Sequence, residues 1–333
     1  MKKTIRFVSL AMAAAMVISV FAGCSKVEDN TSSGANASAA SSASQTEKIR
    51  VAALNGPTAL GMLNMMDNEA YEFTVFSKPD EVTAELNKGT IDIAAVPTNL
   101  AATLYNKNGS VKLLALNTLG VLYVLEKGNS IQSVKDLKGK TIYSTGQGAV
   151  PEYALNYVLE QNGLTVGKDV TVEYKTEHTE LASLMAADKA SIAVLPQPFV
   201  TTVLTQNSEV RVALDLTKEW ESANNATLTM GCLVARTEFV EQNKAAVDAF
   251  LTAYKTSTEK ANSDVDGTAK LAEQHNIIKE AVAKKAIPEC NIVYIAGEEM
   301  KTKANSFFSV LEKANSKSIG GKLPDDNLYY ISE

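Results

Sequence analysis

Four short segments of small polar residues and proline are the best candidates for a ligand site in this sequence. Each lies where a predicted strand ends and a predicted helix begins, and they are Asn55-Gly56-Pro57-Thr58, Pro97-Thr98-Asn99, Thr145-Gly146-Gln147-Gly148 and Pro196-Gln197-Pro198. The start of a helix offers free backbone N–H groups and a partial positive charge, which can hold an anionic or carbonyl group. Turn and capping chemistry would explain any one segment by itself, whereas four of them around one cleft indicate binding.

Patterns typical of catalysis or metal binding are absent from the sequence. The two histidines, His178 and His275, lie far apart, and no HExxH, CxxC, GxSxG or P-loop pattern occurs. The run Gly146-Gln147-Gly148 follows a predicted strand as a dinucleotide-binding turn would, but Pro151 replaces the third glycine. We therefore expect no catalytic residue, no cofactor and no metal, and we interpret His178 as a polar residue near a helix start.

Cys24 lies at the end of an N-terminal segment with its own pattern. A basic start with Lys2, Lys3 and Arg6 precedes an apolar run that ends in Phe21-Ala22-Gly23-Cys24. This order is typical of a secretory signal, and a cysteine directly after small residues resembles the lipobox of bacterial lipoproteins, with Phe21 where leucine is usual. The resemblance implies cleavage before Cys24 and acylation of its thiol with chains such as palmitate. An ordinary signal peptide and a retained transmembrane anchor are the alternatives.

The other two cysteines, Cys232 and Cys290, follow far along the chain. Outside the membrane they could form a disulfide. Two separate buried thiols are the alternative, and their positions in the sequence do not decide between the two.

The segments that position the candidate site alternate between strand and helix patterns. Buried strands are predicted at Lys48–Leu54, Ile91–Val96, Thr141–Ser144 and Ile192–Leu195, each directly before one of the four polar segments. Such alternation predicts parallel sheets with helices on both faces, and ligands bind outside the carboxyl ends of their strands. Between the two halves, Val111–Glu126 is predicted to form one or two strands with a bend near Gly120.

The two halves resemble each other in pattern. Ile93-Ala94-Ala95-Val96-Pro97 falls on Ile192-Ala193-Val194-Leu195-Pro196 when the sequence is shifted by 99 residues without a gap. This indicates two lobes of similar build, although any α/β protein could give such a similarity.

The formal net charge of −6 argues against nucleic acid as a partner. Residues 24–46 are rich in Ser and Ala and are predicted to be a disordered linker.

Several longer motifs resemble one family. IDIAAVPTN at residues 91–99, SIAVLPQP at 191–198, LKGKTI at 137–142 and TMGCLVAR at 229–236 resemble the solute-binding lipoproteins of ABC importers, in the nitrate/taurine/sulfonate and thiamine-pyrimidine branch. The resemblance implies an α/β, type II periplasmic-binding-protein-like fold with two doubly wound lobes joined by two hinge strands. Carried over, it places the signal peptide at 1–23, lobe one at 47–122 and 229–333, and lobe two at 123–228.

The same resemblance implies a function and a site. The protein would be an extracytoplasmic monomer, anchored to the cell membrane by Cys24, that captures a small organic solute by hinge closure and delivers it to an ABC permease. Trp220, the sole tryptophan, could line the pocket or pack within lobe two. The ligand-binding residues would be Asn55, Gly56, Pro57, Thr58, Thr98, Asn99, Thr145, Gly146, Gln147, Gly148, Gln197 and Thr229.

Two other functions remain open at this stage, an extracellular sensor lipoprotein and an enzyme on the same fold. The ligand is open as well. Because the candidate segments contain no Arg, the sequence gives less support to a bidentate arginine contact with a sulfonate or phosphate. Capture of the ligand by backbone N–H groups, or binding of a neutral heteroaromatic such as a pyrimidine, remains open.

Overall fold

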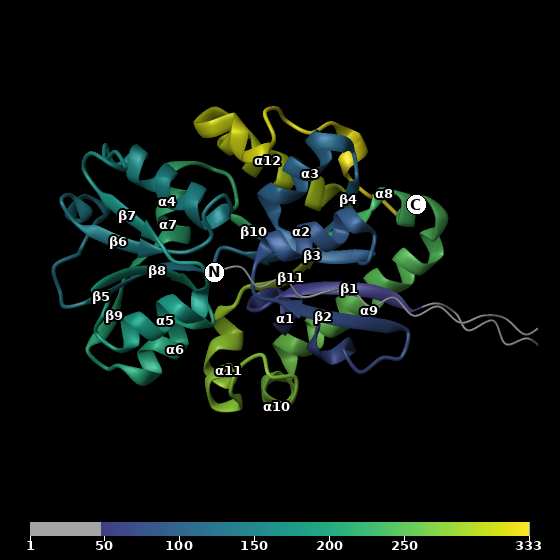
Figure 1. Cartoon of the computed structure of the whole chain (residues 1–333), viewed down its shortest axis with the longest axis horizontal. Coiled ribbons are helices and arrows are strands. Elements are labelled where there is room, and N and C mark those ends of the chain that lie inside the picture. The colour runs from purple at the N-terminus through teal and green to yellow at the C-terminus, as the bar shows by residue number, and fades with distance from the viewer. Residues whose placement is uncertain (1–47, 333) are drawn as a thin grey trace, which may run out of the picture. The chain divides into compact units, whose positions relative to one another are not determined.

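Two β-sheets organise residues 48–332, the part of the chain that this computed structural model describes (Figure 1). The larger sheet has the strand order β11-β4-β10-β3-β1-β2, and the smaller has the order β7-β6-β8-β5-β9. The larger sheet consists of β1 (Ile49–Leu54), β2 (Tyr71–Phe76), β3 (Ile93–Pro97), β4 (Val111–Leu119), β10 (Thr229–Arg236) and β11 (Ile292–Ile295). The smaller consists of β5 (Leu122–Lys127), β6 (Thr141–Ser144), β7 (Thr171–Tyr174), β8 (Ile192–Pro196) and β9 (Val210–Asp215).

Helices accompany both sheets, as the alternating sequence pattern predicts. With the larger sheet, which we call lobe one, lie α1 (Pro57–Leu60), α2 (Pro79–Lys88), α3 (Thr98–Asn108), α8 (Thr237–Gln242), α9 (Lys244–Ser263), α10 (Val265–Gln274), α11 (Glu280–Ala286) and α12 (Gly297–Asn315). With the smaller sheet, lobe two, lie α4 (Val150–Gln161), α5 (His178–Ala186), α6 (Phe199–Gln206) and α7 (Leu216–Ala223). Short 3₁₀ turns occupy Leu63–Met65, Val134–Leu137, Ile287–Glu289, Ser316–Ile319 and Asp326–Leu328.

Each sheet has a parallel centre and antiparallel additions. In lobe one β1 is parallel to β2 and β3, and in lobe two β6 is parallel to β7 and β8. β10 runs antiparallel to β3 and β4, and β5 runs antiparallel to β8 and β9. The prediction of parallel sheets therefore needs a correction. The chain enters lobe two on β5 and returns to lobe one on β10, and both strands run antiparallel to the parallel strands of their sheets.

Both faces of the lobe-one sheet are covered, which explains its continuous apolar strands. Val51 and Ala53 of β1 pack into the cluster that contains Phe250 and Tyr254 of α9. Ala52, which points to the opposite face, packs in the cluster that contains residues of α2, α3 and α12. The alternation of side chains along a strand thus supplies two cores from one segment.

The crossover between the lobes follows the predicted bend. β4 ends at Leu119 and β5 begins at Leu122, so the chain leaves the larger sheet and enters the smaller one around Gly120. It returns between α7 and β10. The limits of the lobes at 47–122, 123–228 and 229–333 stay a prediction.

The two described cysteines do not pair. Cys232 and Cys290 are both free and buried. Cys232 packs in the cluster shared with α2, α3 and α12, whereas Cys290 packs against Leu60 and Ala283 in another cluster. The disulfide that the sequence left open is therefore not formed, because the two thiols lie in different cores.

Three predictions concern segments outside the described residues: the signal peptide at 1–23, the lipidation of Cys24 and the linker at 24–46. Within residues 48–332, no helix is both long and apolar enough to cross a bilayer.

Candidate functional site

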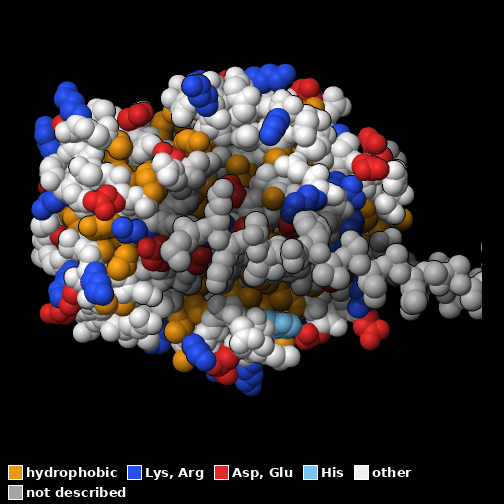
Figure 2. Space-filling model, in the orientation of Figure 1, with side chains coloured by type: hydrophobic (Ala, Val, Ile, Leu, Met, Phe, Trp, Pro, Cys, Tyr) orange, Lys and Arg blue, Asp and Glu red, His pale blue; other side chains and the backbone are white. Residues whose placement is uncertain are grey.

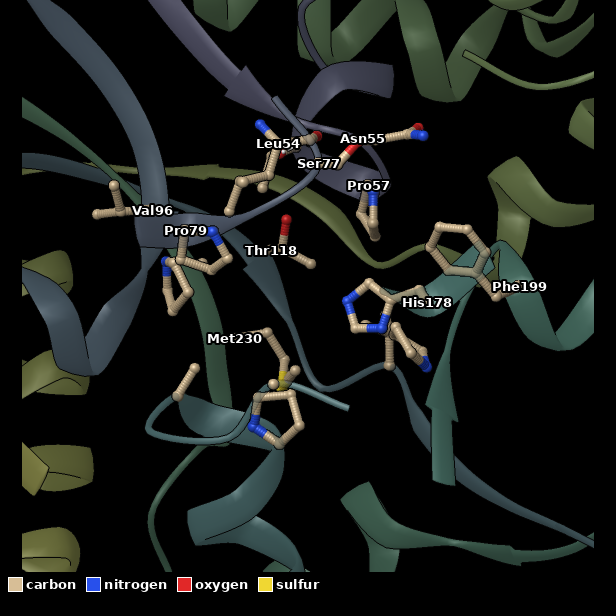
Figure 3. Close-up of a pocket in the computed structure, with 18 of the residues that line it drawn as sticks. Leu54, Asn55, Pro57, Ser77, Pro79, Val96, Thr118, His178, Phe199 and Met230 are labelled. Atoms are coloured by element: carbon tan, nitrogen blue, oxygen red, sulfur yellow. Dashed lines mark hydrogen bonds between the residues drawn. The ribbon is translucent and has the colours of Figure 1, made fainter. Parts of the chain in front are cut away.

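A small cavity of about 110 Å³ lies where the two lobes meet, at the carboxyl ends of several strands (Figure 3). Lobe one lines it with residues at or just after the carboxyl ends of β1, β2 and β3, and with Thr118 of β4 and Met230 and Gly231 of β10. Lobe two contributes Gly146, Ala149, Pro151, Thr176, His178, Pro196 and Phe199. Both lobes therefore shape one cavity, in the position where open α/β sheets bind ligands.

The predicted site residues divide into four groups. Asn55, Pro57, Thr58 and Gly146 line the cavity. Gln147 and Gly148 line a neighbouring groove, together with Gly146 and residues around Lys78 and Lys175. Gly56 lies beside the cavity wall without lining it. The remaining five are buried behind the wall and do not line either space: Thr98, Asn99, Thr145, Gln197 and Thr229.

Several of these polar side chains already form hydrogen bonds with other groups of the protein. The Thr58 hydroxyl donates to the Leu54 carbonyl (2.8 Å), and Gln197 accepts from the hydroxyl of Thr201 (2.8 Å). Asn99 donates to the carbonyl of Gly148 in lobe two (3.2 Å) and to that of Ser318 (3.1 Å). These groups shape the loops and join the lobes, so they are occupied before any ligand arrives.

His178, which the sequence pattern led us to interpret as a polar residue near a helix start, also lines the cavity. It is the first residue of α5, and its Nδ1 lies 2.6 Å from the hydroxyl of Thr145. Burial lowers the pKa of His178 to about 4, so the ring is neutral at pH 7. Its ring lies against that of Phe199, with centroids 5.0 Å apart.

The loops after β2 and β7 were also missed. Ser77 and Pro79 follow β2, and Thr176 and His178 follow β7, and all four line the cavity. The signal that could have found them is the one used elsewhere, a polar segment between a strand and a helix. Thr118, Phe199 and Met230 carry no comparable local signal, because each lies within a strand or a helix.

Charged groups surround the cavity without entering it. Among the described residues that line it, none is Asp, Glu, Lys or Arg. Lys78 of lobe one lies 3.6 Å from Glu177 of lobe two. On the face in Figure 2, acidic and basic side chains are interspersed, unlike the continuous basic surface of a nucleic-acid-binding protein.

Two further predictions, on Trp220 and on metal ligands, can be compared with the structure here. Trp220 packs away from the cavity: its Nε1 donates to the Ala226 carbonyl (2.8 Å), and its ring contacts those of Tyr157 and Phe307. Between residues 48 and 332, no group of three or more His, Cys, Asp or Glu side chains is arranged to hold a metal ion.

Comparison with known proteins gives the family and the fold. The sequence model of the family described as NMT1/THI5 like matches residues 74–266. No curated protein sequence matches the chain.

Solved structures resemble nearly all of the described chain. An ABC transporter from Parabacteroides distasonis is 28% identical with a TM-score of 0.72, covering 86% of this chain and 99% of that chain. The alkanesulfonate-binding protein SsuA from Xanthomonas axonopodis pv. citri, bound to MOPS, is 15% identical with a TM-score of 0.67, covering 86% and 98%. The periplasmic nitrate-binding protein NrtA from Synechocystis PCC 6803 is 11% identical with a TM-score of 0.62, covering 83% and 84%.

These structures confirm the predicted fold class, in which two α/β lobes form a periplasmic-binding-protein-like molecule. The nitrate and sulfonate binders among them agree with the branch that the sequence motifs resemble. Because the family's sequence model matches more than half of its length, the chain belongs to the NMT1/THI5-like family and has the fold of ABC-importer solute-binding proteins.

Proposed function

We propose that this protein is the solute-binding component of an ABC importer, which captures a small organic solute between its lobes and delivers it to a permease. The observation that carries the proposal is the cavity to which both lobes contribute, at the carboxyl ends of their strands. A ligand held there contacts both lobes, so it favours the closed arrangement by its higher affinity for that state.

The site favours binding over catalysis. His178 is neutral and hydrogen-bonded to Thr145, and no acidic or basic residue among those described lines the cavity with it. General acid–base catalysis needs a positioned proton donor or acceptor with a pKa near the working pH. We therefore propose that the solute leaves the site chemically unchanged, which mass spectrometry of the solute before and after incubation will test.

Anchoring through Cys24 is part of the same proposal. It rests on the basic start, the apolar run and Phe21-Ala22-Gly23 before the cysteine. Replacement Cys24→Ser is expected to release the protein into the medium without changing its intrinsic affinity for solute. Loss of solute binding by the purified released protein would contradict this separation of anchor and site.

Solute binding and closure are tested together. The purified protein is screened against a solute library by thermal shift, and small-angle X-ray scattering follows each hit. We expect at least one solute to raise the unfolding temperature and to reduce the radius of gyration. A protein that no solute stabilises or compacts is not a binding component of this kind.

A further inference from the structure

The helix starts around the cavity lack several of the N–H groups that anion capture would need. Pro57 and Pro79 are the first residues of α1 and α2, Pro97 directly precedes α3, and Pro151 is the second residue of α4. All four line the cavity. Proline has no backbone N–H, so these positions offer a ligand apolar ring surface instead of hydrogen-bond donors.

The lobe-two amides beside the cavity already bind carboxylates of the protein. The N–H of Gly148 donates to Glu152 (2.5 Å), and the N–H of Thr176 donates to Glu180 (3.3 Å). These carboxylates occupy the starts of α4 and α5, where an anionic ligand would profit from the helix dipole. An oxyanion would have to displace them or be repelled by them.

Besides Asn55, Ser77 and Thr176, whose side chains are more exposed or lie at the rim of the lining, two polar groups are available to a ligand, one from each lobe. Thr118 lines the cavity and is 2% exposed, and its buried Oγ1 has no hydrogen-bond partner. A buried hydroxyl without a partner is unfavourable, so a ligand that bonds to it recovers that free energy. Across the cavity, His178 has its Nδ1 occupied by Thr145, which leaves Nε2 for a ligand (Figure 3).

We propose that the ligand is an uncharged molecule of about single-ring size that hydrogen-bonds to Thr118 of lobe one and to Nε2 of His178 of lobe two. The proposal deepens the proposed function and rests on it. The cavity measures about 110 Å³, and an engineered apolar cavity of about 150 Å³ is known to hold benzene. An uncharged solute of this kind differs from the alkanesulfonate and the nitrate after which two of the structural neighbours are named.

Pairs of probes that differ only in charge test the ligand class. Benzamide and benzoate, nicotinamide and nicotinate, and benzenesulfonamide and benzenesulfonate are titrated into the protein by calorimetry at pH 7.5. Because an unpaired charge is costly in an apolar site, we expect the neutral member of a binding pair to bind about 100-fold more tightly.

Variants test the two anchors with the tightest-binding neutral probe. Thr118→Val keeps the shape of the side chain and removes its hydroxyl, and His178→Phe keeps a ring and removes both nitrogens. Each is expected to weaken binding about tenfold. Thr83→Val is the matched control, because the Thr83 hydroxyl is also buried without a partner but lies in α2 away from the cavity; it should leave affinity unchanged.

The outcomes separate this inference from the proposed function. If the anionic members bind more tightly, or if Thr118→Val and His178→Phe bind as the unchanged protein does, the ligand class or its anchors are wrong and solute capture still stands. If neither the pairs nor the wider library bind, the proposed function fails together with the inference.

Discussion

Asp92, directly before β3, is the most heavily bonded buried charge in lobe one. It is 3% exposed, and its carboxylate accepts from Arg50 Nη2 (2.6 Å), Arg50 Nε (2.9 Å) and Arg236 Nη2 (2.9 Å). Burial opposes its ionisation, but the hydrogen bonds from the two arginines outweigh it, so the pKa of Asp92 is lowered. Replacement Asp92→Asn removes one side of a buried pair and is expected to destabilise the protein by about 3 kcal/mol.

The lowered pKa gives this prediction a pH signature. Asp92 contributes its stabilisation above the unfolded-state pKa of about 3.9 and loses it as the pH falls through the lower folded-state value. The difference in urea-unfolding free energy between the unchanged protein and Asp92→Asn should therefore shrink below about pH 4. Glu259→Gln, in an exposed pair with Lys255, is the control and should change stability by less than about 0.5 kcal/mol. A difference that stays constant with pH would contradict the ion-pair explanation.

At the candidate site, the sequence predicts which loops lie at the cavity better than it predicts which polar atoms are free to bind a ligand. The loop after β1 was found because glycine, proline and threonine mark a strand-to-helix turn. The sequence could not show that Thr58 would bond back to its own strand, or that His178 would face the cavity. Which polar atoms stay free depends on hydrogen bonds formed after folding, and Thr118 lies inside an apolar strand where nothing local marks it.

The secondary-structure elements could be predicted where one local rule governs them. The bend at Gly120 agrees with the sequence pattern, and the helix that the sequence pattern predicts at Glu298–Lys313 is present as Gly297–Asn315. The spacing of apolar residues over Phe239–Ala261 predicts one helix, but the structure has two there, α8 and α9, because the chain leaves the helical conformation at Asn243, where φ is −134°. Antiparallel placement of β10 depends on the route of the chain between the lobes, which periodicity does not contain.

Gly120 is required because the chain crosses between the lobes through a crowded position. A Cβ atom there would lie 2.3 Å from the side chain of Thr217, which belongs to α7. Gly120→Ala must therefore push α7 away from the crossover and is expected to destabilise the protein by about 1–3 kcal/mol. Denaturant unfolding measures the change.

A second substitution tests the cause of this destabilisation. Thr217→Ala removes both the γ-methyl and the hydroxyl that the new Cβ would meet. In the double variant it should recover a large part of the lost stability, as a double-mutant cycle detects for groups in contact. Additive effects of the two substitutions would show that the clash with Thr217 is not the cause. Gly109→Ala does not serve as a control, because its φ of 66° brings strain of its own.

At the scale of the whole described molecule, few polar contacts join the lobes across the cleft. Lys78 and Glu177 are both more than a third exposed, and such a pair contributes at most about 1 kcal/mol. The amide of Asn99 is 1% exposed and donates to the carbonyl of Gly148 in the other lobe. Burial makes the second contact the better candidate for holding the lobes together.

Asn99→Ala is therefore expected to favour the open arrangement. Removing a hydrogen bond made only with the lobes together shifts their equilibrium by about 1 kcal/mol, which lowers solute affinity by about fivefold and raises the radius of gyration in scattering. Asn106→Ala is the matched control. Asn106 lies on the same helix and donates to two carbonyls, of Ile319 and Lys322, but both belong to lobe one. Equal effects of the two variants on affinity and radius of gyration would show that the Asn99–Gly148 contact stabilises lobe one rather than the closed state.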